Sequence, residues 1–158
     1  MKNNYIKLLL SFLFVALTGY VGSVVTFPSI QSWFTLLEKP SFAPPNWLFG
    51  PAWTTLYILI AIAFYIVWNK EGVEKSLKTK AYWIFGIQLV LNALWSVIFF
   101  GIQNPGWAFV EIIALWLVIL AMIFSFAKIS KSSAWLLLPY ILWVTFASVL
   151  NYSIWSLM

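Results

Sequence analysis

Cysteine and histidine are both absent from this sequence. Without cysteine the chain can form no disulfide bond and offers no thiolate as a nucleophile or metal ligand. Without histidine it lacks the side chain that most often serves acid–base catalysis near neutral pH and the ligation of metals and haem iron. We therefore expect no metal site, no resident cofactor and no conventional catalytic constellation.

Charged side chains are also scarce, since nine lysines and four glutamates, with no arginine or aspartate, make up 8% of the 158 residues. Hydrophobic residues account for 63%, whereas a soluble domain has roughly 45–50% apolar and 25% charged residues. No water-soluble fold of this size could cover so much apolar surface, so the chain is expected to be an integral membrane protein. The net charge of +5 does not indicate a nucleic-acid partner, because the lysines lie in short connecting segments and build no basic face.

Five apolar runs are each long enough to cross the hydrocarbon core of a bilayer, which takes about 20 helical residues. The first could be mistaken for a signal peptide, but it exceeds the apolar region of such a peptide, about 7–15 residues, and no A-x-A cleavage site closes it. The sequence therefore predicts an all-α membrane protein, with a single domain over residues 1–158 built as a bundle of five transmembrane helices. The predicted spans are residues 8–27, 47–68, 81–102, 106–127 and 134–155.

The lysines are distributed unevenly between the connecting segments. Eight of the nine accompany the N-terminus, the second connection and the fourth connection, and only Lys39 lies in the first connection. Because lysine-rich segments are retained in the cytoplasm, the N-terminus is predicted to be cytoplasmic, with the C-terminus and the loop at residues 28–46 outside. This distribution and the bacterial style of the composition predict a multi-pass protein of the bacterial cytoplasmic membrane.

The loop at residues 28–46 is the one long interruption of the apolar sequence. Its prolines at positions 40, 44 and 45 fix φ and disfavour helix at the residues before them, so the stretch 39–45 is expected to be extended and stiff. The helix after it carries aromatic residues on one face: Trp53, Tyr57, Phe64 and Trp68. A rigid loop before an aromatic face is expected to form the mouth of a pocket, although such rings can also be lipid-facing or interfacial anchors.

The third predicted helix carries amides and aromatic rings on one face, at spacings of four, three and four: Gln88, Asn92, Trp95 and Phe99. A polar side chain inside a membrane is costly without a partner, so this face should contact protein or a ligand. The amides either bond a neighbouring helix or face the ligand. The fifth helix shows a similar series, in which Ala147 leaves a gap beside Trp143 that can admit a ligand or a neighbouring helix.

Two other features inside the spans have alternative interpretations. Glu111 is the one carboxylate within a span, and it could be a proton or cation site or could cap the exposed donors at the start of the fourth helix. The first helix has a small-residue face on which a neighbouring helix could approach closely, formed by Gly19, Gly22 and Ser23.

Five motifs along the chain resemble those of the translocator protein family, also called the TspO/MBR, tryptophan-rich sensory protein or peripheral-type benzodiazepine receptor family. The resemblance covers nearly the whole chain. The motifs are Trp33 with Glu38-Lys39-Pro40-Ser41 and Pro44-Pro45; Phe49-Gly50-Pro51-x-Trp53-x-x-Leu56-Tyr57; Asn92-x-x-Trp95-x-x-x-Phe99-Phe100; Gly106-Trp107-Ala108; and Pro139-Tyr140-x-x-Trp143-x-x-Phe146-Ala147-x-x-Leu150-Asn151-Tyr152.

This resemblance implies a five-helix bundle, commonly a homodimer, with a pocket between the helices that is closed by the loop after the first helix. The pocket of the family accepts porphyrins such as protoporphyrin IX and drugs of the isoquinoline carboxamide or benzodiazepine type. With the aromatic faces above, the expected ligand-binding residues are Trp53, Tyr57, Asn92, Trp95, Phe99, Trp107, Trp143, Ala147 and Leu150. The expected lid residues are Trp33, Pro44 and Pro45.

The leading functional hypothesis is a membrane receptor or sensor for flat apolar ligands, linked to tetrapyrrole homeostasis or a stress response. Because strong axial ligands for haem iron are missing, metal-free porphyrin is favoured over haem. In bacterial members of the family the tryptophans matching Trp53 and Trp143 are associated with light- and oxygen-dependent porphyrin breakdown, so such an activity is one alternative. Transport of porphyrin or another small molecule and a scaffold role are the others. Cholesterol binding is doubtful, because no basic residue follows Leu150-Asn151-Tyr152 as in animal members.

Overall fold

The structure is a computed structural model that describes residues 2–158, with side chains from residue 4 onward. Met1, the first residue of the predicted domain, lies outside the described residues. The structure is 85% helical, and no described residue lies in a strand. The elements in chain order are α1 (Lys2–Gln31), α2 (Trp33–Leu36), η1 (Asn46–Leu48), α3 (Phe49–Asn69), α4 (Lys75–Ser96), η2 (Val97–Gly101), α5 (Pro105–Ala127), α6 (Lys131–Leu136) and α7 (Leu138–Ser156).

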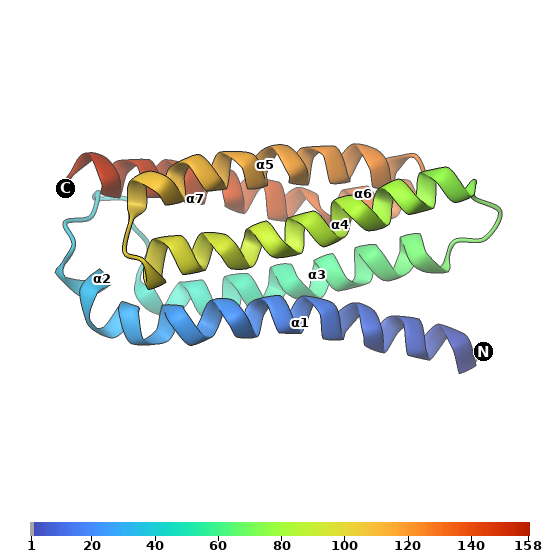
Figure 1. Ribbon diagram of the computed structural model, residues 1–158, viewed down its shortest axis with the longest axis horizontal. Coiled ribbons are helices and arrows are strands. Elements are labelled where there is room, and N and C mark those ends of the chain that lie inside the picture. The colour runs from blue at the N-terminus through green and yellow to red at the C-terminus, as the bar shows by residue number, and fades with distance from the viewer. Residues whose placement is uncertain (1) are drawn as a thin grey trace.

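The elements combine into five segments that are long and apolar enough to cross a membrane: Asn4–Gln31, Asn46–Asn69, Lys75–Gly101, Pro105–Ala127 and Lys131–Ser156. They run side by side as an elongated bundle, with the N-terminus and the C-terminus at opposite ends (Figure 1). The predicted fold class is therefore confirmed. The cytoplasmic location of the N-terminus stays a prediction.

The first helix is longer, and the loop after it shorter, than the sequence predicts. α1 continues through Pro28 to Gln31 and α2 follows almost at once, so the predicted loop at residues 28–46 is helical over much of its first half. Pro28 has no backbone N–H, so the helix loses one hydrogen-bond donor at this position. The Pro28 carbonyl oxygen accepts a hydrogen bond from Ser32 Oγ at 2.8 Å. The later prolines do end the helix, although a turn in which the Ala43 N–H donates to the Pro40 carbonyl (2.9 Å) interrupts the expected extended stretch.

The fifth span consists of two helices, α6 and α7, that meet at Leu137. Pro139 has no N–H to donate to the preceding turn, which interrupts the helical hydrogen-bond ladder. The Leu137 N–H bonds the Ala134 carbonyl oxygen at 3.1 Å, in a tighter turn than an α-helix makes. The proline thus divides the span near the end that contains the N-terminus of the chain (Figure 1).

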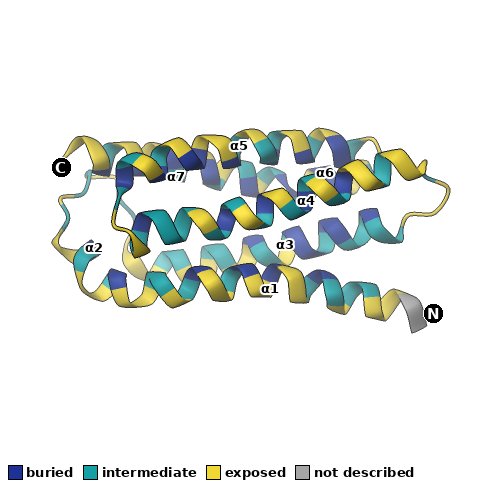
Figure 2. Ribbon diagram, in the orientation of Figure 1, coloured by how far each residue is buried: buried dark blue, intermediate teal, exposed yellow. Residues whose placement is uncertain are grey.

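The half of the bundle that contains the N-terminus holds a cluster of buried apolar residues, whereas many residues on the outer faces of the helices are exposed (Figure 2). The Phe64 ring of α3 stacks parallel on the Phe85 ring of α4, with centroids 3.7 Å apart. Met122 of α5 is completely buried in the same cluster. Exposed leucines follow one another along the outer face of α1, as expected for a surface that meets lipid: Leu9, Leu13 and Leu17.

Large exposed aromatic residues gather toward the two ends of the bundle, where the membrane boundaries are expected. Tyr5, Trp83 and Trp135 lie toward the end with the N-terminus. Trp47, Trp107 and Trp155 lie toward the opposite end. This arrangement is typical of interfacial anchors and explains why much of the aromatic content faces away from the protein interior.

Candidate functional site

An interior cavity of about 490 Å³ occupies the half of the bundle that contains α2 and the C-terminus. Its walls come from α1, η1, α3, the joined helices α4 and η2, and α7, and one residue of α2 closes it. None of the described residues that line it is charged. Ten of its lining residues are aromatic: Phe27, Phe34, Trp47, Phe49, Trp53, Tyr57, Trp95, Phe99, Phe100 and Trp143.

The structure brings most of the predicted ligand-binding residues together around this cavity. They come from three different helices, α3, the α4–η2 helix and α7, and each faces the same space. The predicted residues that line the cavity are Trp53, Tyr57, Trp95, Phe99, Trp143, Ala147 and Leu150.

A π-helical turn widens the aromatic face of the third span. In η2 the Ile102 N–H donates to the Val97 carbonyl at 2.8 Å, five residues back. Such a turn carries one more residue than an α-helical turn and often marks a functional site. Neighbouring residues Phe99 and Phe100 therefore both line the cavity, with ring centroids 4.8 Å apart. The sequence motif contains Phe100, but helical spacing alone selects only Phe99.

The lid over the cavity is formed by α2. Phe34 is only 3% exposed, and its ring makes edge contacts with Phe49, Phe99 and Phe100 at centroid distances of 6.5, 6.1 and 5.5 Å. Lys39 Nζ lies 4.7 Å from the centre of the Phe34 ring, a cation–π contact that holds the loop on the lid.

The residues predicted to form the lid have other positions. Trp33 contacts Phe99 edge-on at 5.7 Å from outside the cavity, and Pro44 and Pro45 do not line it. The prolines set the path of the loop, whereas Phe34, which no motif or helical spacing in the sequence indicates, closes the space. The short helix α2 could not be predicted from the spacing of its few residues.

Asn92 belongs to a hydrogen-bond network beneath the cavity. The Tyr57 hydroxyl donates to Asn92 Oδ1 (2.9 Å), Asn92 Nδ2 donates to the Tyr140 hydroxyl (2.9 Å), and that hydroxyl donates to Gln88 Oε1 (3.0 Å). The amides therefore bond neighbouring helices, which was one of the two predicted possibilities. Asn92 does not line the cavity but fixes the position of Tyr57, which does.

The two tryptophans that face the cavity from α4 and α7 differ in their hydrogen bonding. Trp95 Nε1 donates to Asn151 Oδ1 at 3.0 Å, and Asn151 Nδ2 donates to the Pro105 carbonyl oxygen at 2.7 Å. Trp143 Nε1 is buried and has no hydrogen-bond partner among the described residues. A buried N–H without an acceptor is costly, so the Trp143 indole is a ready donor for an oxygen or nitrogen of a bound ligand.

Trp107 does not line the cavity, contrary to the expectation from the resemblance. The inward face of α5 consists of buried residues at helical spacing, including Ala108, Glu111 and Ile112. Trp107 is one position before that face and is 68% exposed on the outside of the bundle. Its position near the end of the span is that of an interfacial anchor.

Glu111 is buried, and neither of its carboxylate oxygens has a hydrogen-bond partner in the part of the chain that the structure describes. The exposed donors of α5 are capped instead by Asn104, whose Oδ1 accepts from the Trp107 N–H at 3.0 Å. The capping alternative for Glu111 is therefore wrong. Glu111 also does not line the cavity, so it has no direct contact with a ligand there.

The wall formed by α1 was not predicted to be part of the site. It comes from the small-residue face, together with residues within about two turns before or after it: Ala16, Gly19, Gly22, Ser23, Thr26, Phe27 and Ile30. A Cβ atom on Gly19 would lie 2.8 Å from Tyr57 Cε2, and one on Gly22 would lie 3.2 Å from Ser96 Oγ. The small residues therefore allow close packing, as predicted, and line the cavity as well.

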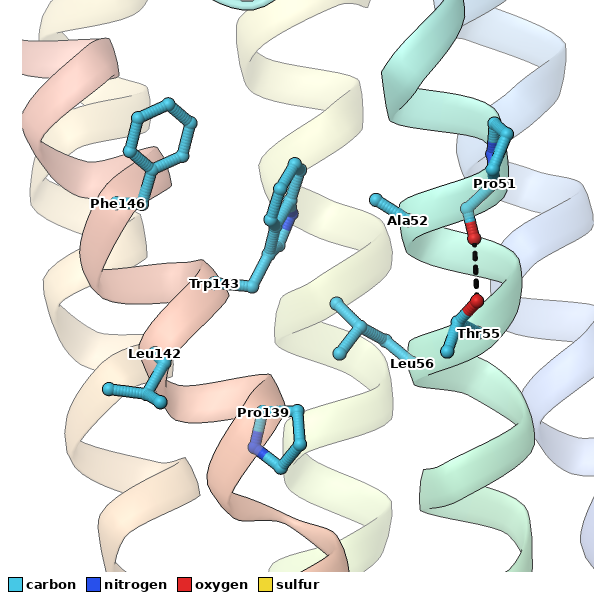
Figure 3. A pocket seen from close by; sticks show the side chains of 8 residues that line it. All are labelled: Pro51, Ala52, Thr55, Leu56, Pro139, Leu142, Trp143 and Phe146. Carbon is cyan, nitrogen blue, oxygen red and sulfur yellow. Dashed lines mark hydrogen bonds between the residues drawn. The ribbon is translucent and has the colours of Figure 1, made fainter.

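A second hollow of about 510 Å³ lies outside the cavity, between α3 and α7 (Figure 3). Trp143 lines both spaces and projects from α7 toward α3. The Thr55 hydroxyl on its wall donates to the Pro51 carbonyl oxygen of its own helix at 2.9 Å, so its proton is already used within the helix. This hollow is an open groove on the lipid-facing surface, and the aromatic cavity is the better candidate site.

Comparison with known proteins agrees with this architecture. A model of the TspO/MBR family matches residues 11–156. The chain is 49% identical to the tryptophan-rich protein TspO of Archaeoglobus fulgidus over 98% of both chains. It is 36% identical to protein CrtK of Rhodobacter capsulatus over 92% of this chain and 89% of that protein, and 35% identical to the translocator protein of Homo sapiens over 86% of this chain and 80% of that protein. This multi-pass membrane protein belongs to the TspO/MBR family.

Proposed function

We propose that this protein is a membrane receptor that binds porphyrins, such as protoporphyrin IX, and flat apolar drugs of the isoquinoline carboxamide or benzodiazepine type. Membership of the TspO/MBR family supports a membrane sensor or receptor role. The observation that carries the ligand class is the 490 Å³ cavity with ten aromatic residues on its walls. Aromatic faces and edges stabilise a flat conjugated ligand by stacking and by burial of apolar surface.

The polar groups of the cavity favour a metal-free porphyrin over haem. The cavity is lined by hydroxyl and amide side chains and by the free Trp143 N–H, and not by histidine, cysteine or methionine, the usual axial ligands of haem iron. These neutral groups can bond pyrrole nitrogens, carbonyls or carboxylates at the edge of a ligand. Ligand binding inside the membrane would report tetrapyrrole levels to the cell.

The proposal is tested by titrating the purified protein with protoporphyrin IX and following the quenching of tryptophan fluorescence. We expect the double substitution Trp53→Phe with Trp143→Phe to weaken binding by at least about tenfold, equivalent to about 1.4 kcal/mol, because two stacking surfaces and one donor are lost. The matched control is Trp107→Phe, which removes an indole from the outer surface and should leave affinity unchanged. Equal affinity of the double variant and the wild type would refute the assignment of the cavity.

A second candidate function is light-driven oxidation of the bound porphyrin, in which molecular oxygen is the final acceptor of the electrons that the porphyrin loses, and nearby indoles donate electrons transiently to the photoexcited ring and recover them as the porphyrin is oxidised. It is favoured by one observation: Trp53 and Trp143 both line the cavity. The Trp53 ring also lies 5.5 Å from the Tyr57 ring and 6.3 Å from the Tyr140 ring, so oxidisable rings adjoin one another. Illumination under oxygen should give a new chromophore faster with the wild type than with the double variant. A rate equal to that of porphyrin in protein-free detergent would exclude this activity.

A further inference from the structure

One side of the cavity is exposed along the line where α1 and α3 meet. The lining residues there are exposed or half-buried, and they form two facing stripes, which we call the seam: Ala16, Ser23, Thr26 and Phe27 on α1, and opposite them Trp47 of η1 with Gly50 and Thr54 of α3. Phe27 and Trp47 are 66% and 71% exposed at the end nearest the loop. The seam lies within two membrane-spanning segments, so its exposed side faces lipid.

The two helices touch at the inner end of the seam and leave space further out. The Gly19 backbone lies so close to Tyr57 that a Cβ atom at Gly19 would be 2.8 Å from the Tyr57 ring. Because α1 and α3 run in opposite directions, this contact places Thr26 approximately opposite Gly50. A Cβ atom on Gly50 would meet nothing within 4 Å. The seam is therefore closed near Gly19 and open near Gly50.

The other sides of the cavity are closed by specific contacts. At the outward end, Phe34 is buried under the loop and covered by Lys39. On the far wall, the hydrogen bond between Trp95 and Asn151 joins the third and fifth spans. The floor is the hydrogen-bond network that starts at Tyr57. At the seam, by contrast, no hydrogen bond or cation–π contact between described side chains joins the two facing stripes.

The chemistry of the seam suits an apolar molecule. Its two bonded hydroxyls are satisfied within their own helices: the Ser23 hydroxyl donates to the Tyr20 carbonyl at 2.8 Å and the Thr54 hydroxyl to the Gly50 carbonyl at 2.9 Å. None of its residues is charged. An apolar ligand dissolved in the bilayer could pass such a surface without removing water from a charge.

We propose that ligands reach the cavity sideways, from the bilayer through the seam between α1 and α3, and not from water past the loop. This inference rests on the proposed function, because it concerns the route of the same ligand. It predicts that the loop and α2 can stay in place while the ligand enters and leaves. It also predicts that closing the seam changes the rates of binding more than the affinity.

The absence of cysteine from the natural chain makes a direct test possible. The variant Thr26→Cys with Gly50→Cys, in lipid nanodiscs, is cross-linked across the seam with a short bismaleimide. Binding of protoporphyrin IX is then followed by stopped-flow quenching. We expect the cross-link to slow association and dissociation by at least about tenfold relative to the same protein before cross-linking, since the route is obstructed. Porphyrin bound before cross-linking should remain bound, which shows that the cavity itself is intact.

The matched control fixes the loop instead of the seam. Phe42 of the loop and Phe146 of α7 are in edge contact, with centroids 6.4 Å apart, and neither lines the cavity. Cross-linking Phe42→Cys with Phe146→Cys should leave both rates within about twofold. Unchanged rates after closure of the seam, or slow binding only after fixation of the loop, would overturn the lateral route. Absence of quenching by the wild-type protein in the same nanodiscs would instead refute the proposed function.

Discussion

The eleven tryptophans differ in whether their indole N–H is free to donate a hydrogen bond to a ligand. The Trp95 N–H is already bonded to Asn151, and the Trp116 N–H donates to Thr145 Oγ1 at 2.8 Å on the outer surface. The Trp143 N–H is buried and free. The Trp95 indole therefore joins two helices, whereas the Trp143 indole can donate to a ligand. The spacing of tryptophans along the sequence does not reveal this difference.

At the residue scale, Asn151 should contribute strongly to stability. Its side chain is buried and satisfies both the Trp95 N–H and the Pro105 carbonyl oxygen. Asn151→Leu should lower the free energy of unfolding by about 1–3 kcal/mol, because it leaves two buried polar groups without partners. Unfolding in detergent, followed by circular dichroism, measures the loss.

The control for this substitution is Ser153→Ala on the same helix. The Ser153 hydroxyl is exposed and donates only to the Val149 carbonyl oxygen of its own helix at 2.9 Å. Its removal should change stability by no more than about 0.5 kcal/mol. If both variants lost the same stability, the assigned role of Asn151 would be wrong.

At the scale of the elements, the close approach of α1 to α3 depends on a glycine. Gly19→Ala should push the Tyr57 ring away and strain its hydrogen bond to Asn92, at a cost of about 1–3 kcal/mol, since the added methyl group would lie within 2.8 Å of the ring. Gly86→Ala on α4 adds the same group where nothing lies within 4 Å.

The second alanine substitution should be neutral or stabilise the protein by up to about 1 kcal/mol, because glycine is the poorer helix former. Thermal unfolding of the two variants in the same detergent gives the comparison. A loss of stability at Gly86 equal to that at Gly19 would contradict the packing described for α1 and α3.

Helix faces explain how much of the site could be predicted. The faces of α3, α4 and α7 carry distinctive residues at helical spacing, and Trp53, Trp95 and Trp143 do line the cavity. The α1 face carries small residues, which indicate close packing and not a ligand. Trp107 belongs to a family motif, but a single position along a helix turns a side chain by about 100°, enough to place this ring outside.

At the scale of the whole molecule, the five-helix bundle follows from the length of the apolar runs. The run lengths do not give the helix ends, because Pro28 is accommodated within α1 and α2 forms inside the predicted loop. The cavity also depends on features that leave no regular spacing of residues in the sequence, such as the π-helical turn and the lid residue Phe34. Tertiary contacts determine these features, which is why the run lengths could not give them.

The predicted orientation in the membrane can be tested on the whole protein. Ser41 in the loop and Glu71 in the second connection are both exposed and lie at opposite ends of the bundle. A single cysteine at Ser41 should react with a membrane-impermeant maleimide on intact spheroplasts, and one at Glu71 only after the membrane is opened. The reverse pattern would contradict the orientation that the lysine distribution predicts.

Filling the aromatic cavity with a larger side chain tests whether this cavity is the ligand site. Ala147→Phe places a ring in the space beside Trp143, whereas Ala114→Phe adds the same ring on the exposed face of α5. The measurement is a protoporphyrin IX titration of both variants, with circular dichroism to confirm that each keeps its helices. We predict at least about tenfold weaker binding for Ala147→Phe and unchanged binding for Ala114→Phe. Wild-type affinity in a folded Ala147→Phe protein would contradict the assignment of the cavity.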